Sequence, residues 1–138
     1  MTLLEVSNTG LPTAGEIGDM RLISAVRKGL AVQEVDGLLA SGRLSAAELD
    51  RLALPRKTLN HRRGLGRLSP EQSDRLIRLL RVIGLAEETF GTATKAHRWL
   101  RLPTAALAGN APIDLLDTEV GARQVETLLG RIAHGIAA

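Results

Sequence analysis

The chain has 138 residues, of which 44% are hydrophobic, and this length suits one domain or two small ones with a buried core. It contains no cysteine, which excludes disulfides, thiolate metal sites and cysteine nucleophiles, and its 1% aromatic content argues against base-stacking platforms for single-stranded nucleic acid. The formal net charge is only +3, but residues 51–81 hold nine Lys and Arg against two acidic residues, and this clustering points to nucleic acid as a partner rather than to an evenly solvated surface.

Residues 1–15 contain Gly, Pro, Thr and Asn without a sustained hydrophobic period, and we expect a flexible N-terminal tail there. The only hint of a strand in the chain is at residues 3–6. No apolar run approaches the roughly 18 residues that a membrane span needs, and the first residues lack the basic stretch and apolar run of a signal peptide. We therefore expect a soluble, cytoplasmic protein.

Apolar residues recur at helical spacing in the two segments that follow. The first predicted helix begins at about Met20 and ends near Gly29. The second begins at about Val32 and ends at Ser41, before Gly42, because glycine is the usual residue just past a helix end.

Residues 45–67 carry the plan of a helix-turn-helix. Ser45 and Glu48 are spaced as a capping box, which starts a short helix. Pro55 ends this helix, because the residue before a proline is pushed out of the helical region, and it opens a second short helix over residues 56–63. Two short helices around a tight turn, the second of them basic, predict a fit to the major groove of DNA.

The second of these helices supplies the candidate DNA contacts, because recognition helices meet base edges near their start. Asn60 can pair with adenine, and the arginines can reach guanine edges or phosphates. For each single arginine the alternative is a phosphate contact or a solvated charge, and His61 reads as a surface residue beside the phosphates. The candidate DNA-binding residues are Arg56, Lys57, Thr58, Asn60, His61, Arg62, Arg63 and Arg67.

A long helix is predicted next. Ser69 and Gln72 are spaced as a second capping box, with a proline at the first helical position, and the apolar stripe that follows extends the helix over residues 70–90, where Gly91 closes it. Residues 64–66, Gly-Leu-Gly, follow no predicted strand and lack the third glycine of a dinucleotide-binding loop, so they read as a hinge between helices.

The remainder reads as a separate and smaller helical unit. One helix stops before Pro103, one or two helical turns end at Gly109, and Asp117 or Thr118 caps a last amphipathic helix. The expected fold is therefore all-α. Its expected parts are the tail at residues 1–15, a helix-turn-helix bundle at residues 16–90 and a C-terminal domain at residues 91–138.

Catalytic chemistry has no residue pattern behind it. His61, His97 and His134 are far apart in the sequence, without the spacing of metal ligands, and no nucleophile lies beside a base. We expect no catalytic residues, no metal and no cofactor, and the chain is not expected to be an enzyme.

The second half of the chain resembles a known family. The segments VIGLAEETFG (82–91) and AHRWLRLP (96–103), with the stretch from residue 106 to the end, are similar to the C-terminal part of Xre/MbcA/ParS antitoxins. Residues 55–76 resemble that family's helix-turn-helix and following helix. The resemblance covers about residues 20–138. The matching positions are Phe90, Gly91, Trp99, Leu100, Pro103, Leu107, Gly109, Pro112, Leu115, Leu116, Thr118, Gly121, Val125, Leu128, Arg131, Ile132 and Gly135.

This resemblance implies a protein with two roles. The helix-turn-helix bundle would bind operator DNA and repress the protein's own operon, and the C-terminal domain would cover the active site of a RES-domain toxin, which degrades NAD or transfers ADP-ribose from it. The resemblance also implies a homodimer within a larger toxin-antitoxin complex. The toxin-binding residues that it suggests are Trp99, Arg131, Ile132, His134, Gly135, Ile136 and Ala138.

Alternatives remain open for these residues and for the whole chain. Trp99 reads more readily as a core anchor than as a binding hot spot, because a chain with two aromatic residues needs them inside, and the last helix can be an ordinary terminal helix. The chain as a whole can instead be a stand-alone transcription regulator with a C-terminal dimerisation unit, or a toxin-binding protein that has lost DNA binding.

Overall fold

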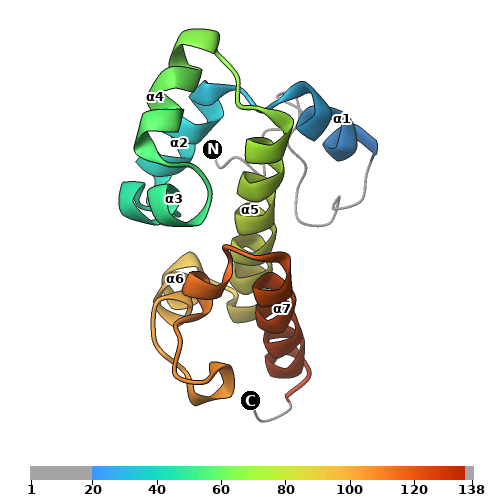
Figure 1. Cartoon of the computed structure of the whole chain (residues 1–138). Helices are drawn as coiled ribbons and strands as arrows, with labels where there is room; N and C mark the ends of the chain where they lie inside the picture. Colours follow the sequence, from blue (N-terminus) through green and yellow to red (C-terminus); the bar gives the residue numbers. More distant parts are fainter. Residues whose placement is uncertain (1–19, 136–138) are drawn as a thin grey trace. The chain divides into compact units, whose positions relative to one another are not determined.

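The computed structural model of the chain describes residues 20–135, and these residues form an all-α fold (Figure 1). The all-α prediction is confirmed, since the described part has seven α-helices, two short 3-10 helices and no strand. The predicted tail at residues 1–15 and the possible strand at residues 3–6 lie outside the described residues. The helices are α1 (Met20–Lys28), α2 (Val32–Ser41), α3 (Ala46–Leu52), α4 (Arg56–Leu65), α5 (Pro70–Phe90), α6 (Ala93–Leu100), η4 (Ala105–Leu107), η5 (Pro112–Leu115) and α7 (Glu119–Ala133).

The chain forms two compact units, and the division between them falls inside α5. The first unit ends at Ile77 and the second begins at Arg78. Helix α5 therefore contributes its first part to one unit and the rest to the other. The domain boundary expected after residue 90 lies at the C-terminal end of this helix, past the division.

The helix starts predicted from capping boxes are confirmed. The Ser45 N–H donates to Glu48 Oε1 at 2.9 Å, and the Glu48 N–H donates to Ser45 Oγ at 3.1 Å. Ser69 and Gln72 make the same pair of bonds, at 2.8 and 3.1 Å, at the start of α5. Each box satisfies backbone N–H groups that have no partner within the helix.

The predicted hinge at residues 64–66 is wrong in its first two residues. Gly64 and Leu65 are the last residues of α4, and only Gly66 leaves the helix, with a left-handed φ of 80° and its N–H bonded to the carbonyl oxygen of Arg62 at 2.8 Å. The helix can continue through Gly64 because glycine costs a helix only about 1 kcal/mol relative to alanine. Pro55 is the N-cap of α4 rather than its first residue.

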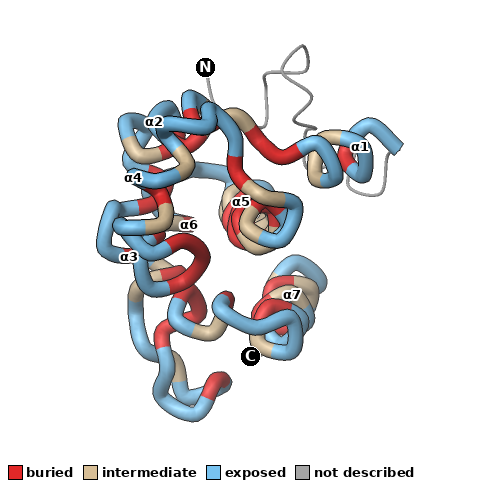
Figure 2. Tube along the Cα trace, turned by 45° about the horizontal axis from the view of Figure 1, so that its top comes forward, coloured by how far each residue is buried: buried red, intermediate tan, exposed pale blue. Residues whose placement is uncertain are grey.

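The core of the first unit is built from aliphatic side chains, as the low aromatic content requires. In Figure 2 the buried residues (red) alternate with exposed ones (pale blue) along its helices, which is the pattern of amphipathic helices. Its largest fully buried side chains are Leu38, Leu44, Leu54, Leu68 and Leu76.

Two turns that are distant in sequence are joined inside this unit. The turn between α1 and α2 and the turn between α4 and α5 exchange backbone hydrogen bonds, from the Val32 N–H to the Gly66 oxygen at 3.0 Å and from the Leu68 N–H to the Leu30 oxygen at 2.8 Å. The Leu30 N–H donates to the hydroxyl oxygen of the fully buried Ser73 at 2.8 Å. These bonds fix the end of α4 against the first two helices.

Candidate nucleic-acid interface and C-terminal surface

The turn between α3 and α4 is tight and internally bonded. Helix α3 ends at Leu52, and the N–H groups of Ala53 and Leu54 both donate to the Leu49 oxygen, at 3.0 and 2.8 Å. The Arg56 N–H then donates to the Asp50 carboxylate at 2.7 Å, so that a side chain of α3 satisfies a free donor at the start of α4. Leu54 is buried, and the two short helices are thereby held as a helix-turn-helix.

The first two turns of α4 present four of the candidate DNA-binding residues on one face. Arg56, Lys57, Asn60 and His61 are exposed, and their side chains make no hydrogen bond or ion pair with the part of the chain that the structure describes. Their spacing places them side by side on the helix, while Leu59 is buried. This face offers two cations, an amide and an imidazole to a ligand such as DNA.

The other four candidate DNA-binding residues are half-buried or bonded within the chain. Thr58 is half-buried. Arg62 donates through Nε to the Arg67 backbone oxygen at 2.8 Å, and Arg67 donates through Nη1 to the Gly29 oxygen at 2.8 Å. Arg63 donates through Nη1 to the Asp36 carboxylate at 2.8 Å. Sequence reasoning missed these roles, because the partners of Arg63 and Arg67 lie on elements distant in sequence.

The Arg63–Asp36 pair joins α4 to α2 at the surface, with side-chain exposures of 43% and 48%. The hydrogen bond from the Arg63 guanidinium, with its positive charge, lowers the pKa of the Asp36 carboxyl below its ordinary value despite partial burial. Asp36 is therefore an anion at neutral pH, and it stands beside a residue predicted to contact DNA.

The second unit holds Trp99 in a half-buried position on α6. Its ring centroid lies 5.3 Å from that of Phe90 at the end of α5, with the planes tilted by 42°. Two polar contacts fix this region: Thr92 caps α6 by accepting from the Lys95 N–H at 3.2 Å, and His97 Nε2 lies 2.7 Å from the Glu87 carboxylate. Trp99 is thus partly an anchor for α6 and partly available at the surface.

The start of α7 is packed closely against the preceding 3-10 turn. Thr118, one of the two residues predicted as its cap, accepts from the Gly121 N–H at 2.9 Å. A Cβ placed on Gly121 would lie 1.9 Å from the Leu115 backbone oxygen, so that only glycine fits there without a backbone shift. Ile113 in η5 and Leu116 directly after it are buried.

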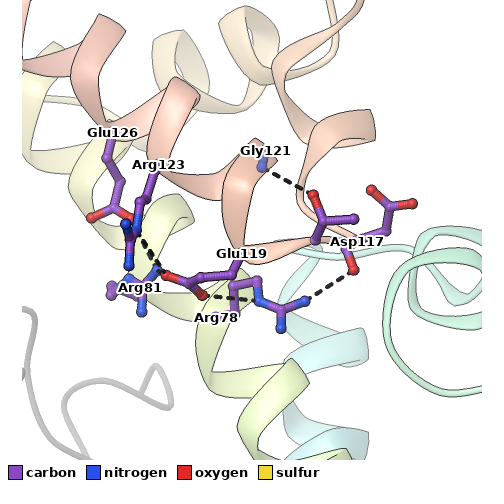
Figure 3. A network of polar contacts seen from close by, with 8 residues as sticks. Arg78, Arg81, Asp117, Glu119, Gly121, Arg123 and Glu126 are labelled. Atoms are coloured by element: carbon purple, nitrogen blue, oxygen red, sulfur yellow. Dashed lines mark hydrogen bonds and ion pairs between the residues drawn. The ribbon is translucent and has the colours of Figure 1, made fainter.

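A network of charges fixes the same end of α7 to α5 (Figure 3). Arg78 donates to the Asp117 backbone oxygen at 3.0 Å and to the Glu119 carboxylate at 3.3 Å. Arg81 donates to Glu119 at 3.0 Å and to Glu126 at 2.9 Å. Burial raises the pKa of Glu119, but the charges and hydrogen bonds of the two arginines outweigh it, and the pKa lies below its ordinary value.

Sequence reasoning counted these two arginines in the basic cluster that pointed to nucleic acid, and it missed the network. A signal was present in the spacing. Arg78 and Arg81 lie three residues apart, and Glu119 and Glu126 lie seven apart, so each pair shares a helix face. The signal could not show that the two faces meet.

The C-terminal end of α7 carries most of the suggested toxin-binding residues. Arg131 and His134 are exposed, Ile132 is half-buried, and His134 Nδ1 lies 2.7 Å from the Gly130 oxygen. Gly135 is exposed, with a left-handed φ of 72°. Ile136 and Ala138 lie outside the described residues. The described end of α7 therefore offers a cation, an imidazole and one partly exposed aliphatic side chain.

The part of the chain that the structure describes holds neither a cluster of metal ligands nor a membrane-spanning helix. Within residues 20–135 there is no group of three or more His, Cys, Asp and Glu side chains placed to hold a metal ion. In the same range, no helix is both long enough and apolar enough to cross a membrane.

Comparison with known proteins finds similarity along both units. The family model of the antitoxin Xre-like helix-turn-helix domain matches residues 21–81, and that of the antitoxin Xre/MbcA/ParS C-terminal toxin-binding domain matches residues 85–135. A protein named antitoxin Xre from Yersinia enterocolitica is 35% identical over 118 residues, which cover 83% of this chain and 80% of the relative.

Two further relatives are similar over most of their length. A Pseudomonas putida protein, also named antitoxin Xre, is 35% identical over 118 residues, covering 85% of this chain and 74% of the relative. A Sphingobium protein named Prs ADP-ribosylating antitoxin is 31% identical over 124 residues, covering 82% of this chain and 78% of the relative. The matches therefore extend through the helix-turn-helix and the C-terminal surface alike.

Proposed function

The chain belongs to the Xre/MbcA/ParS family of antitoxins, and we propose that it neutralises a RES-domain toxin with its second unit and represses its own operon with its first. The observation that carries the proposal is the succession of the two family matches, one over the helix-turn-helix and one over the C-terminal unit. The proposed setting is the cytoplasm, where operator DNA lies, and the proposed assembly is a homodimer within a larger toxin-antitoxin complex.

The proposed toxin is an enzyme that degrades NAD or transfers ADP-ribose from it. Support comes from the family resemblance and from the relative whose name includes the words ADP-ribosylating antitoxin. In this proposal the antitoxin acts by covering the toxin's active site, and it has no catalytic step or cofactor of its own.

The proposed toxin contact lies at the C-terminal end of α7. Arg131 and His134 are exposed there. Arg131 can donate to polar groups of a site that binds a phosphate-rich substrate, and His134 keeps Nε2 for a polar contact, because its Nδ1 lies against the Gly130 oxygen. Ile132 can add apolar area beside them. We propose that Trp99, which is half-buried on α6, adds an aromatic ring to the toxin contact.

Co-expression with a RES-domain toxin, sought in the gene beside this one, tests the neutralisation. We expect the wild-type chain to restore growth, and Arg131→Ala/His134→Ala to bind the toxin about tenfold or more weakly, because two polar contacts are lost from a desolvated interface. Arg123→Ala is the matched control, since Arg123 is an arginine on the same helix with 79% of its side chain exposed. Equal affinities of all three proteins in calorimetry would place the contact elsewhere.

Titration of DNA binding against salt tests the operator contact. We expect Arg56→Gln/Lys57→Gln to weaken binding to a duplex from the chain's own promoter, and to flatten the log–log salt slope by about two, since each phosphate neutralised contributes roughly −0.9. Lys95→Gln/Arg98→Gln is the control, because it removes the same charge from exposed residues of α6. An unchanged slope in the α4 variant would remove these residues from the contact.

The two tests together separate the alternatives. Operator binding without toxin binding would identify a stand-alone transcription regulator with a C-terminal dimerisation unit. Toxin binding without any salt-dependent DNA binding would identify an antitoxin that has lost its DNA contact.

A further inference from the structure

Three arginines lie at or just after the end of α4, the helix proposed to contact DNA, and one of them is bonded to an acid. Arg62 and Arg67 donate to backbone oxygens, which carry no net charge. Arg63 donates to the carboxylate of Asp36 on α2, at 2.8 Å. Both side chains are close to half exposed, so that water, ions and a phosphate group can reach the pair.

A carboxylate and a DNA phosphate make the same demand on an arginine. Both are anionic oxygen acceptors that bind the guanidinium fork by charge-assisted hydrogen bonds. An arginine that moves its donors from Asp36 to a phosphate loses one such bond when it gains the other. Asp36 also places a negative charge beside the helix that would approach the negative DNA backbone.

We propose that Asp36 competes with DNA phosphate for Arg63 and thereby holds the chain's affinity for DNA below what its basic residues allow. This inference rests on the proposed DNA binding by α4. Asp36 is then a residue that sets affinity without reading sequence, because phosphate contacts position a protein but do not distinguish bases. The gain on removing Asp36 should therefore be equal on specific and unspecific DNA.

A purely structural role for the pair predicts a different result. Exposed ion pairs contribute little to the stability of a fold, and they are screened by salt. If Asp36 served only to hold α2 against α4, its removal would loosen α4 and weaken DNA binding. Competition for Arg63 predicts tighter binding instead.

The test measures DNA affinity of Asp36→Asn by fluorescence anisotropy at several salt concentrations. We expect binding about threefold to tenfold tighter at 0.1 M salt, and a log–log slope steeper by about one phosphate. The probes are a duplex from the chain's own promoter and a random-sequence duplex of equal length, and both should gain by the same factor. Asp36→Ala serves as a second variant should the amide disturb α2.

Two further variants make the result specific. Glu34→Gln makes the same charge change on α2 at a half-buried residue that is not bonded to Arg63 within the described chain, and it should change affinity by less than about twofold. In an Arg63→Gln background, Asp36→Asn should lose most of its effect. A wild-type chain that binds neither duplex would overturn the proposed DNA binding and this inference with it. A wild-type chain that binds, with a folded Asp36→Asn that binds no tighter, would overturn the competition alone.

Discussion

Replacing Gly121 by alanine is expected to abolish toxin neutralisation while leaving DNA binding in place. The added Cβ would stand 1.9 Å from the Leu115 oxygen and 2.9 Å from the Leu115 carbonyl carbon. Both are backbone atoms, so no side-chain rotation relieves the clash, and the first turn of α7 must move. We expect a loss of about 3 kcal/mol or more in the stability of the second unit, at the upper end of what overpacking costs.

Gly130→Ala on the same helix is the matched control. Apart from the backbone of its own helix and its two chain neighbours, no atom lies within 4 Å of the position that its Cβ would take. Alanine should therefore stabilise α7 by roughly 0.5–1 kcal/mol through helix propensity. Chemical denaturation, co-expression with the toxin and anisotropy on the promoter duplex give the three readouts. Equal stability of the two alanine variants would contradict the close packing of α7 on η5.

Replacing Gly29 by alanine is expected to have the reverse functional effect, loss of DNA binding with neutralisation retained. Gly29 has a left-handed φ of 89°, and a Cβ there would lie 2.1 Å from the Leu68 oxygen. Leu30 and Val32, which follow Gly29, make backbone hydrogen bonds to the turn between α4 and α5, so the end of α4 would lose its support. The backbone strain and the clash together should cost the first unit about 3 kcal/mol or more.

Gly37→Ala is the control for this second experiment, because Gly37 lies within α2 and its added Cβ would meet no atom within 4 Å besides its chain neighbours and the backbone of its own helix. It should bind the promoter duplex like the wild type and unfold at the same temperature or slightly higher. If Gly29→Ala and Gly121→Ala each abolished both activities, the two units would fold as one cooperative block, and the assignment of one activity to each unit would lose its support.

The helix starts could be predicted from sequence, because the interactions that define them span three residues. Ser45 with Glu48, and Ser69 with Gln72, are complete capping signals within one turn of helix, and no distant element decides whether they form. The family resemblance added what spacing alone cannot give, namely the identity of the C-terminal unit. The end of α4 lies two residues later than the sequence predicts, because Gly64 stays within the helix and Gly66 is the glycine that ends it.

The partners of the arginines could not be predicted in the same way. Arg63, Arg67 and Arg81 all look alike in a basic stretch of sequence. Their partners are an acid 27 residues earlier, a backbone oxygen 38 residues earlier and two acids 38 and 45 residues later. The packing of the helices decides whether an arginine faces solvent or an acid. A local sequence pattern does not contain this information. The basic cluster therefore overstated the number of charges available to DNA.

The course of α5 through both units bears on how such proteins can exchange parts. A hybrid gene joined after residue 90, where the helix ends, would take α7 from one parent and Arg78 and Arg81 from the other. Glu119 and Glu126 would then come from one parent, and the other parent need not have an arginine at position 78 or 81 to pair with them. A hybrid joined before Arg78 inherits the arginines together with their acids. We expect chimeras with exchanged toxin specificity to be more stable when the crossover point lies before Arg78 than when it lies after residue 90.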